Sequence, residues 1–232
     1  MHALSVGGSA GPHRGVQDLA LLGPLHRDLQ RPRCQRLEVL GRRADGYHEI
    51  DTVLQTLDLA DRVAIHAEGQ PGIDLHGPFA RGLPADETNL AWRAASELAA
   101  RCGESVDGLS IEIEKYVPPA SGLGGGASDA ATVLRLLQQW WPAATESHVR
   151  EAAAAVGSDE TYFLVGGTAR ARGRGERVDP LPELPRRGVV LFLPWKTLER
   201  KTGRMFEALG RLPFDRGGVA EAFSASPPLD FM

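Results

Sequence analysis

The feature that most constrains this chain is the glycine-rich segment 118–129, PPASGLGGGASD, which joins an alternating apolar segment to a helical one. Its four glycines are Gly122, Gly124, Gly125 and Gly126. Because glycine has no side chain, successive backbone N–H groups can approach an anion closely, and the following helix points the positive end of its dipole at the same place. The sequence therefore predicts a phosphate-binding loop, and we expect the bound group to belong to a nucleotide.

The segments on either side of this loop have clear periodicities. Apolar and polar residues alternate over 109–114, which predicts a half-buried strand that ends before Pro118. Apolar residues at helical spacing predict helices over 130–141 and 149–156, the second of which ends at Gly157. The loop is therefore expected to lie between a strand and a helix.

The rest of the chain mixes strands and helices without strict alternation, which favours an α+β architecture. We expect a loop over 68–86. In the first half of the chain we also expect a hairpin that turns at Asp45-Gly46 and a strand over 63–67. A helix that carries Leu90, Ala94 and Leu98 is expected to be capped by Thr88 or Asn89 and to end at Gly103. In the second half we expect a short helical or extended piece over 160–165, alternating small and basic residues over 168–172, a buried strand over 189–193, and a basic helix over 195–209.

Composition excludes several classes of function. A chain of 232 residues with 42% hydrophobic content can bury the core of one large domain, or of one domain with a smaller companion. The net charge of −4 gives no global field that would attract nucleic acid or an anionic membrane. Two cysteines, Cys34 and Cys102, indicate neither a disulfide framework nor a zinc site. We expect a cytoplasmic protein without a targeting or membrane segment that acts on a small molecule, with its oligomeric state left open.

Other kinds of glycine loop fit the segment less well. A Walker A loop needs a lysine after its last glycine, and here Gly126 is followed by Ala127 and Ser128. A dinucleotide-binding fingerprint is matched by Gly122, Gly124 and Ala127, but no carboxylate follows at the distance needed to hold a ribose. A surface loop without a ligand is the remaining alternative, and it would be favoured for an isolated run of glycines.

The segment 115–134, KYVPPASGLGGGASDAATVL, resembles the phosphate loop of the GHMP small-molecule kinases. Residues 41–63 and 156–182 resemble two further blocks of the branch that phosphorylates 4-diphosphocytidyl-2-C-methyl-D-erythritol. The resemblance extends from about Leu37 to Phe206. It implies the GHMP kinase fold, with an N-terminal domain like ribosomal protein S5 domain 2 and an incomplete ferredoxin-like C-terminal domain.

The same resemblance implies domain limits and an activity. We expect an atypical segment at 1–36, for which disorder is one expectation, an ATP-binding domain at 37–186, and a partial C-terminal domain at 187–232. The implied reaction is the ATP- and Mg²⁺-dependent phosphorylation of the 2-hydroxyl of the acceptor, in non-mevalonate isoprenoid biosynthesis. The alternatives are a catalytically impaired nucleotide-binding fragment of such a kinase, or a GHMP kinase for another small alcohol.

The loop supplies most of the expected ATP-binding residues. Its members are Pro119, Ala120, Ser121, Gly122, Leu123, Gly124, Gly125, Gly126, Ala127 and Ser128. Ser128, at the start of the helix, is expected to offer its hydroxyl to Mg²⁺ in a shell otherwise made of water, while Asp129 is expected to be a carboxylate favoured by the helix dipole. The resemblance adds Asn89 and Lys115 at the adenine pocket, with placement on the surface as the alternative for both.

Asp159 is the predicted catalytic residue. It follows Gly157 and Ser158, between a helix end and the next element, where a carboxylate can project into a cleft. A helix N-cap is the alternative for an aspartate in this position. The resemblance places the general base of the family in a matching Gly-(Ala/Ser)-Asp motif, although the family continues with Val-Pro where this chain has Glu160-Thr161.

Three aromatic or imidazole side chains are candidates for the acceptor site. Tyr47 and His48 match the block that, by the resemblance, contacts the cytidine, and an aromatic ring stacks on a base with about 1–3 kcal/mol. A core tyrosine beside a solvated histidine is the alternative. Trp195 is expected to face the cytosine from the other side, with a buried or interfacial tryptophan as its alternative.

The chain departs from the family pattern at both ends. Counting back from Gly41, Pro32 stands where the family has a lysine and Cys34 where it has an asparagine. Arg31 or Arg33 would replace that lysine only in part, because a guanidinium fork differs from an ammonium point charge. Members of the family also continue beyond the position of residue 232. We therefore expect a shifted reading frame or a misplaced start near codon 36, and truncation after codon 232.

Overall fold

The computed structural model describes residues 21–22, 37–66, 70–184, 189–191, 193, 201–209, 214 and 218. Its strands are β1 (Leu21–Leu22), β2 (Leu37–Arg42), β3 (His48–Gln55), β4 (Arg62–His66), β5 (Gly72–His76), β6 (Ser110–Glu114), β7 (Thr168–Gly173) and β8 (Arg177–Pro180). Its helices are α1 (Leu90–Cys102), α2 (Gly125–Trp140), α3 (Glu146–Val156), α4 (Glu160–Val165) and α5 (Lys201–Leu209). The predicted α+β architecture is confirmed.

The strands form two four-stranded sheets. One sheet has the order β2-β3-β7-β8 and is antiparallel throughout. The other has the order β1-β4-β6-β5, in which β5 runs parallel to β6 and the remaining pairs are antiparallel. Neither sheet of the described residues is the doubly wound parallel sheet of a dinucleotide-binding domain, so that alternative for the glycine loop is wrong.

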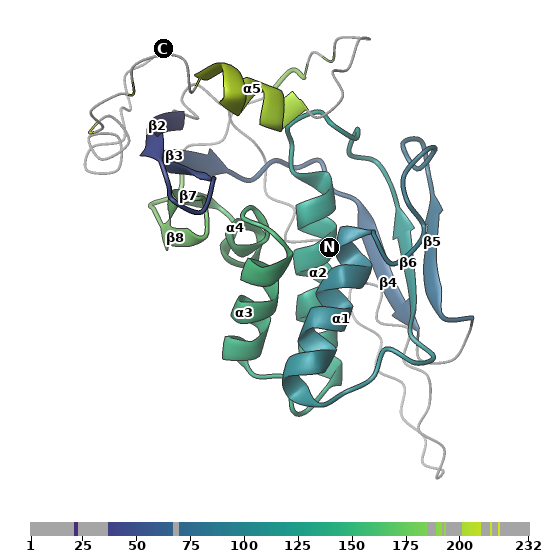
Figure 1. The fold of residues 1–232 in the computed structure, drawn as a ribbon. Coiled ribbons are helices and arrows are strands. Elements are labelled where there is room, and N and C mark those ends of the chain that lie inside the picture. The colour runs from purple at the N-terminus through teal and green to yellow at the C-terminus, as the bar shows by residue number, and fades with distance from the viewer. Residues whose placement is uncertain are drawn as a thin grey trace.

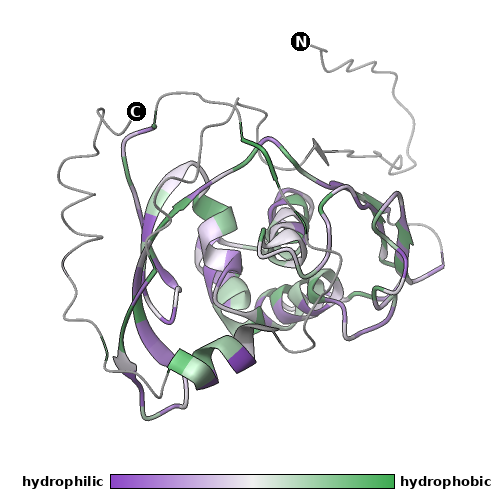
Figure 2. Cartoon of the chain, turned by 90° about the horizontal axis from the view of Figure 1, so that it is seen from above, coloured by the Kyte–Doolittle hydropathy of each residue, from purple (hydrophilic) through white to green (hydrophobic). Residues whose placement is uncertain are grey.

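The helices α1 to α4 lie between the two sheets (Figure 1), and the view from above shows the same arrangement (Figure 2). The main core forms where α1, α2 and α3 pack against β4 and β6. The largest fully buried side chains of the described residues are Leu98, Ile111, Ile113, Leu134, Leu137, Val133 and Val149. Because α2 passes through this core, its first turn has a fixed position relative to both sheets.

The predicted ends of the first helix are confirmed. Asn89 is the N-cap of α1, and its Oδ1 accepts a hydrogen bond from the N–H of Ala91 at 2.9 Å. Gly103 ends the helix in the left-handed conformation, with φ of 73°. Helix α2 begins at Gly125, earlier than its apolar periodicity predicts. No helix in the described part of the chain is long and apolar enough to cross a bilayer.

Two predictions about the strands are wrong. The expected loop over 68–86 contains β5, whose apolar residues Ile73 and Leu75 pack against the core. The expected buried strand over 189–193 is not formed by its described residues, and Val190 is 96% exposed. An apolar run favours extended backbone but does not provide a neighbouring strand, and pairing and burial depend on that neighbour.

Candidate active site

The glycine loop leaves a row of backbone donors without acceptors. Gly122 and Gly124 adopt left-handed conformations, with φ of 85° and 70°, and Gly124 caps α2 without a side-chain hydrogen bond. Among the described residues, no acceptor contacts the N–H groups of Gly122 or of residues 124–127. The first turn of α2 also contains no acidic residue. An anion placed here would satisfy these donors and interact with the helix dipole.

The loop is packed closely against its neighbours. A Cβ atom at Gly124 would lie 2.7 Å from the ring of Phe163 in α4, and one at Gly125 would lie 2.9 Å from the side chain of Val117. No larger residue fits at either position unless the neighbour moves. Glycine is therefore needed both for the conformation of the loop and for its contact with α4.

We expect the substitution Gly124→Ala to weaken ATP binding by at least about tenfold, because alanine is strained at this φ and its methyl group collides with Phe163. Isothermal titration calorimetry with an ATP analogue would measure the change. Gly41→Ala is the matched control, since a Cβ atom at Gly41 meets nothing within 4 Å. Equal ATP affinity of the Gly124→Ala protein and the wild type would contradict this role of the loop.

The loop opens onto a cavity of about 1570 Å³. Its walls come from the glycine loop, the β2–β3 hairpin, the segment before α4 and helix α5. A second cavity of about 120 Å³ is also lined by residues of the loop. Asp159 and Gly124 line both cavities, so the predicted base and the predicted phosphate loop face the same space.

Asp159 has the position of an N-cap but not its hydrogen bond. It precedes α4, and its side chain makes no capping interaction. No other partner for the carboxylate occurs within the described ranges. Desolvation by the surrounding walls raises the pKa of Asp159. A carboxylate that faces a cavity and lacks a hydrogen-bond donor is available to accept a proton from a bound molecule, which favours the catalytic interpretation over simple capping.

Ser128 lines the smaller cavity together with Asp159. Its backbone N–H donates to Gly124, and its carbonyl accepts a hydrogen bond from the hydroxyl of Thr132, while its own hydroxyl has no partner in the described chain. The described residues contain no group of three or more histidine, cysteine or acidic side chains that could hold a metal ion. A single hydroxyl fits a Mg²⁺ ion that keeps water and phosphate oxygens as its other ligands.

Lys115 lies in a buried cluster with two carboxylates. Its Nζ contacts Oδ2 of Asp61 and lies 2.5 Å from Oδ2 of Asp129, and its side chain is only 4% exposed. The alternative of surface placement is therefore wrong, whereas ATP binding by Lys115 stays a prediction. Asp129 also differs from its expected role, since its carboxylate pairs with the ammonium group instead of only facing the helix dipole.

The pKa of Asp129 should make stability depend on pH. Burial, together with the second carboxylate, outweighs the single ammonium group and raises the pKa of Asp129 to about 7. The folded protein then retains a proton that the unfolded chain loses near pH 4, so the unfolding free energy falls as the pH rises from about 4 to about 7. Urea denaturation across this range should show that the unfolding free energy falls less in Asp129→Asn than in the wild type. An identical fall in both proteins would contradict the assignment of the raised pKa to Asp129.

Asn89 is engaged by the protein itself. Besides capping α1, its Nδ2 donates to the carbonyl of Pro84 at 2.8 Å. The side chain lines the large cavity, but both of its polar atoms already have partners. Contact of Asn89 with ATP stays a prediction.

The predicted acceptor residues lie at the hairpin end of the large cavity. Tyr47 is 51% exposed, and His48 stacks on Phe206 of α5 with ring centroids 4.9 Å apart. Nε2 of His48 is buried without a hydrogen-bond partner in the described structure, which is unusual for a polar atom and is explained if a ligand supplies that partner. Trp195 lies outside the described residues.

Sequence reasoning missed three charged residues of this region. Asp61 anchors the start of the loop, because its Oδ1 accepts hydrogen bonds from the N–H groups of Tyr116 at 2.5 Å and Val117 at 2.8 Å. Arg42 and Arg174 line the large cavity. An aspartate before a strand and arginines in an arginine-rich chain have no distinctive local pattern, so only the fold identifies them.

Comparison with known proteins assigns this arrangement to a class. Residues 89–167, which contain the glycine loop and Asp159, match the family described as GHMP kinases N terminal domain. This part of the chain is therefore similar to a GHMP kinase N-terminal domain, as its sequence motifs predict.

Several curated relatives of the chain share one name. The 4-diphosphocytidyl-2-C-methyl-D-erythritol kinase of Saccharopolyspora erythraea is 39% identical over 179 residues, which are 76% of this chain and 56% of the relative. The enzyme of that name from Pelotomaculum thermopropionicum is 43% identical over 159 residues, 68% of this chain and 55% of the relative. The predicted resemblance to this branch is confirmed, and the chain spans about half the length of these relatives.

A solved structure supports the same relationship. The crystal structure of a 4-(cytidine 5'-diphospho)-2C-methyl-D-erythritol kinase superposes with a TM-score of 0.50 at 37% sequence identity. The match covers 72% of this chain and 56% of that one. The GHMP kinase fold inferred from the sequence is therefore confirmed for the matched part.

Proposed function

We propose that this protein transfers the γ-phosphoryl group of ATP to the 2-hydroxyl of 4-diphosphocytidyl-2-C-methyl-D-erythritol, a step in the non-mevalonate synthesis of isoprenoid precursors. The observation that carries the proposal is that the unpartnered carboxylate of Asp159 and the open amides of the glycine loop line one cavity of the described structure. Phosphoryl transfer requires positioning, charge neutralisation and a group that orients or deprotonates the attacking hydroxyl. The amides of the glycine loop suit the positioning of the phosphates, and the carboxylate of Asp159 suits the deprotonation of the hydroxyl.

The residues then have distinct roles. The N–H groups between Ser121 and Ser128 hold the β- and γ-phosphates, and Asp159 accepts the proton of the acceptor hydroxyl. Mg²⁺ would supply neutralisation of the phosphate charge, with the hydroxyl of Ser128 as its protein ligand. The exposed ring of Tyr47 and the unpartnered Nε2 of His48 support cytosine binding at the hairpin end of the cavity.

We further propose the organisation of the whole chain. Residues 37–186 form the ATP-binding domain, and residues 187–232 belong to a partial ferredoxin-like domain. The protein acts in the cytoplasm on a small molecule, without a nucleic-acid or membrane partner.

One experiment separates this function from its alternatives. ATP binding and acceptor-dependent ADP release are measured independently on the purified chain, with the cytidine acceptor and with small alcohols that lack cytidine. The proposal predicts ATP binding and ADP release only with the cytidine acceptor. Binding without release would instead identify an impaired nucleotide-binding fragment, which Pro32 at the family's lysine position favours. Release with another alcohol alone would identify a different GHMP kinase.

A further inference from the structure

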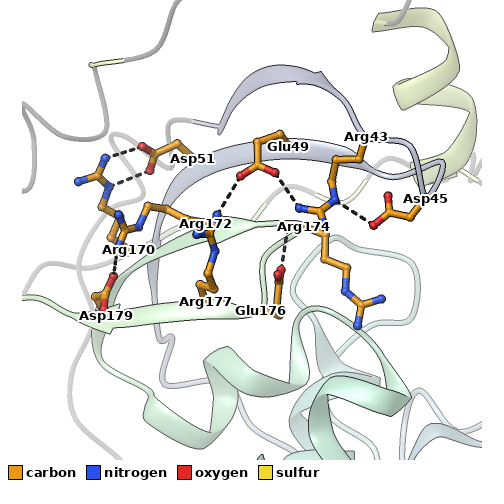
Figure 3. Close-up of polar contacts among 10 residues, drawn as sticks. All are labelled: Arg43, Asp45, Glu49, Asp51, Arg170, Arg172, Arg174, Glu176, Arg177 and Asp179. Atoms are coloured by element: carbon orange, nitrogen blue, oxygen red, sulfur yellow. Dashed lines mark hydrogen bonds and ion pairs between the residues drawn. The ribbon is translucent and has the colours of Figure 1, made fainter. Parts of the chain in front are cut away.

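Most arginines of the β2-β3-β7-β8 sheet are neutralised by carboxylates (Figure 3). The pairs are Arg43 with Asp45 and Glu49, Arg170 with Asp51, Arg172 with Asp179, and Arg177 with Glu49, at N–O distances between 2.5 and 3.0 Å. None of these four arginines lines the large cavity. Their charges are used within the sheet and are not directed at a ligand.

Arg42 and Arg174 differ from the other four arginines both in their pairing with carboxylates and in their position relative to the cavity. Within the described residues, neither guanidinium forms an ion pair with a carboxylate, and both side chains line the large cavity. In Figure 3, the guanidinium of Arg174 extends away from the paired row, and the dashed line between Arg174 and Glu176 starts at the backbone N–H of Arg174 and not at its guanidinium. The two arginines of this sheet that have no carboxylate partner among the described residues therefore both line the cavity.

The fold brings these two charges to the same end of the sheet. Arg42 is the last residue of β2 and pairs in register with His48. Arg174 follows Gly173, the residue of β7 that pairs with Ile50, so the β7–β8 turn lies beside the β2–β3 turn. The Cζ atom of Arg174 lies 5.1 Å from the ring centre of Tyr47. Both cations therefore adjoin the proposed cytosine site.

Arg174 is held in place while keeping donors available. One Nη donates to the carbonyl of Ala154 at 2.5 Å, and the Cζ atom lies over the ring of Tyr47. The negative charge that faces Arg174 from α4 is Glu160, which interacts with it electrostatically, and the two form no ion pair in the described structure. A guanidinium has five N–H donors, so most of those of Arg174 can still bind an oxyanion.

We propose that Arg42 and Arg174 bind the diphosphate group of the acceptor. This inference rests on the proposed function, in which the diphosphate connects the cytosine near Tyr47 to the hydroxyl near Asp159. The diphosphate carries two negative charges, and the net charge of the chain, −4, offers it no general attraction. Two cations at the hairpin end of the cavity supply that attraction locally, while the glycine loop serves the phosphates of ATP.

The test compares cytidine 5'-diphosphate with cytidine by isothermal titration calorimetry, so that it does not depend on turnover. We expect Arg42→Ala and Arg174→Ala each to weaken cytidine diphosphate binding by about tenfold and cytidine binding by less than about threefold. Arg174→Lys should retain part of the preference for the diphosphate. The control is Arg172→Ala, because Arg172 is on the same sheet, pairs with Asp179 and lies away from the cavity.

The outcomes distinguish this inference from the proposed function. If the wild type binds both ligands and the two variants keep the wild-type preference for the diphosphate, the arginine assignment is overturned and the proposed function stands. If the variants lose affinity for ATP and not for cytidine diphosphate, the two arginines serve the other substrate and the inference is again overturned. If the wild type binds neither cytidine ligand, the proposed acceptor itself is wrong, and the inference is overturned with it.

Discussion

Asp159→Asn is expected to lower the turnover number for the cytidine acceptor by about 10²–10⁴-fold, the usual contribution of general acid–base catalysis. Asparagine keeps the size of the side chain but cannot accept the proton of the attacking hydroxyl. ATP binding should be little changed, because the phosphates are assigned to the backbone of the glycine loop. Steady-state ADP release and calorimetric titration of ATP would measure the two quantities separately.

The control for this substitution is Asp179→Asn. Asp179 is an exposed aspartate of β8 whose ion pair with Arg172 lies outside the cavity, so its loss should leave turnover unchanged. Equal turnover of Asp159→Asn and the wild type would show that another group receives the proton.

The pH profile gives a second measurement on the same carboxylate. Desolvation raises the pKa of Asp159 above 3.8, so the base becomes protonated at a higher pH than an ordinary aspartate does. Because only the ionised form accepts a proton, kcat/KM should have its maximal value above this raised pKa and should fall as the pH drops through it. The acidic limb should disappear from any residual activity of Asp159→Asn.

Local chemistry determined the parts of this fold that the sequence could predict. Asn89 and Gly103 end α1 as expected because capping and left-handed termination depend on the residue itself. The glycine loop was predictable for the same reason, since its backbone conformation excludes other residues at Gly124. Where the residue type dictates the conformation, the sequence is sufficient.

Features that depend on distant partners were not predictable. The strand β5 was missed because its pairing is parallel to β6, which lies more than thirty residues further along the chain. Surface placement of Lys115 stayed open as an alternative because its partners, Asp61 and Asp129, are 54 and 14 residues away. Which arginines remain unneutralised likewise follows from strand register, so Arg42 and Arg174 could not be separated from their paired neighbours.

The largest effect on stability is expected at Asp61. Its side chain is 2% exposed, accepts two backbone hydrogen bonds through Oδ1 and contacts the ammonium of Lys115 through Oδ2. Asp61→Ala leaves the N–H groups of Tyr116 and Val117 without an acceptor and removes one counter-charge. Because Asp129 still faces the ammonium of Lys115, the cost comes mainly from the two buried donors, at about 1–3 kcal/mol each, and we expect the unfolding free energy to fall by about 2–6 kcal/mol, as measured by urea denaturation at pH 7.

Asp61 and Asp129 should respond differently, although both contact the same ammonium group. Asp129→Asn leaves a balanced pair of Lys115 and Asp61 and makes no backbone donor lose its acceptor, so its cost should be below about 2 kcal/mol. Asp61→Asn should fall between the two, because its oxygen can still accept from the backbone. Asp74→Ala, on the exposed side of β5, controls for the loss of an acidic residue. Asp61→Ala and Asp129→Asn could instead lower the unfolding free energy equally. That result would mean that charge alone explains why Asp61 is buried, and that its hydrogen bonds to the chain before the glycine loop do not.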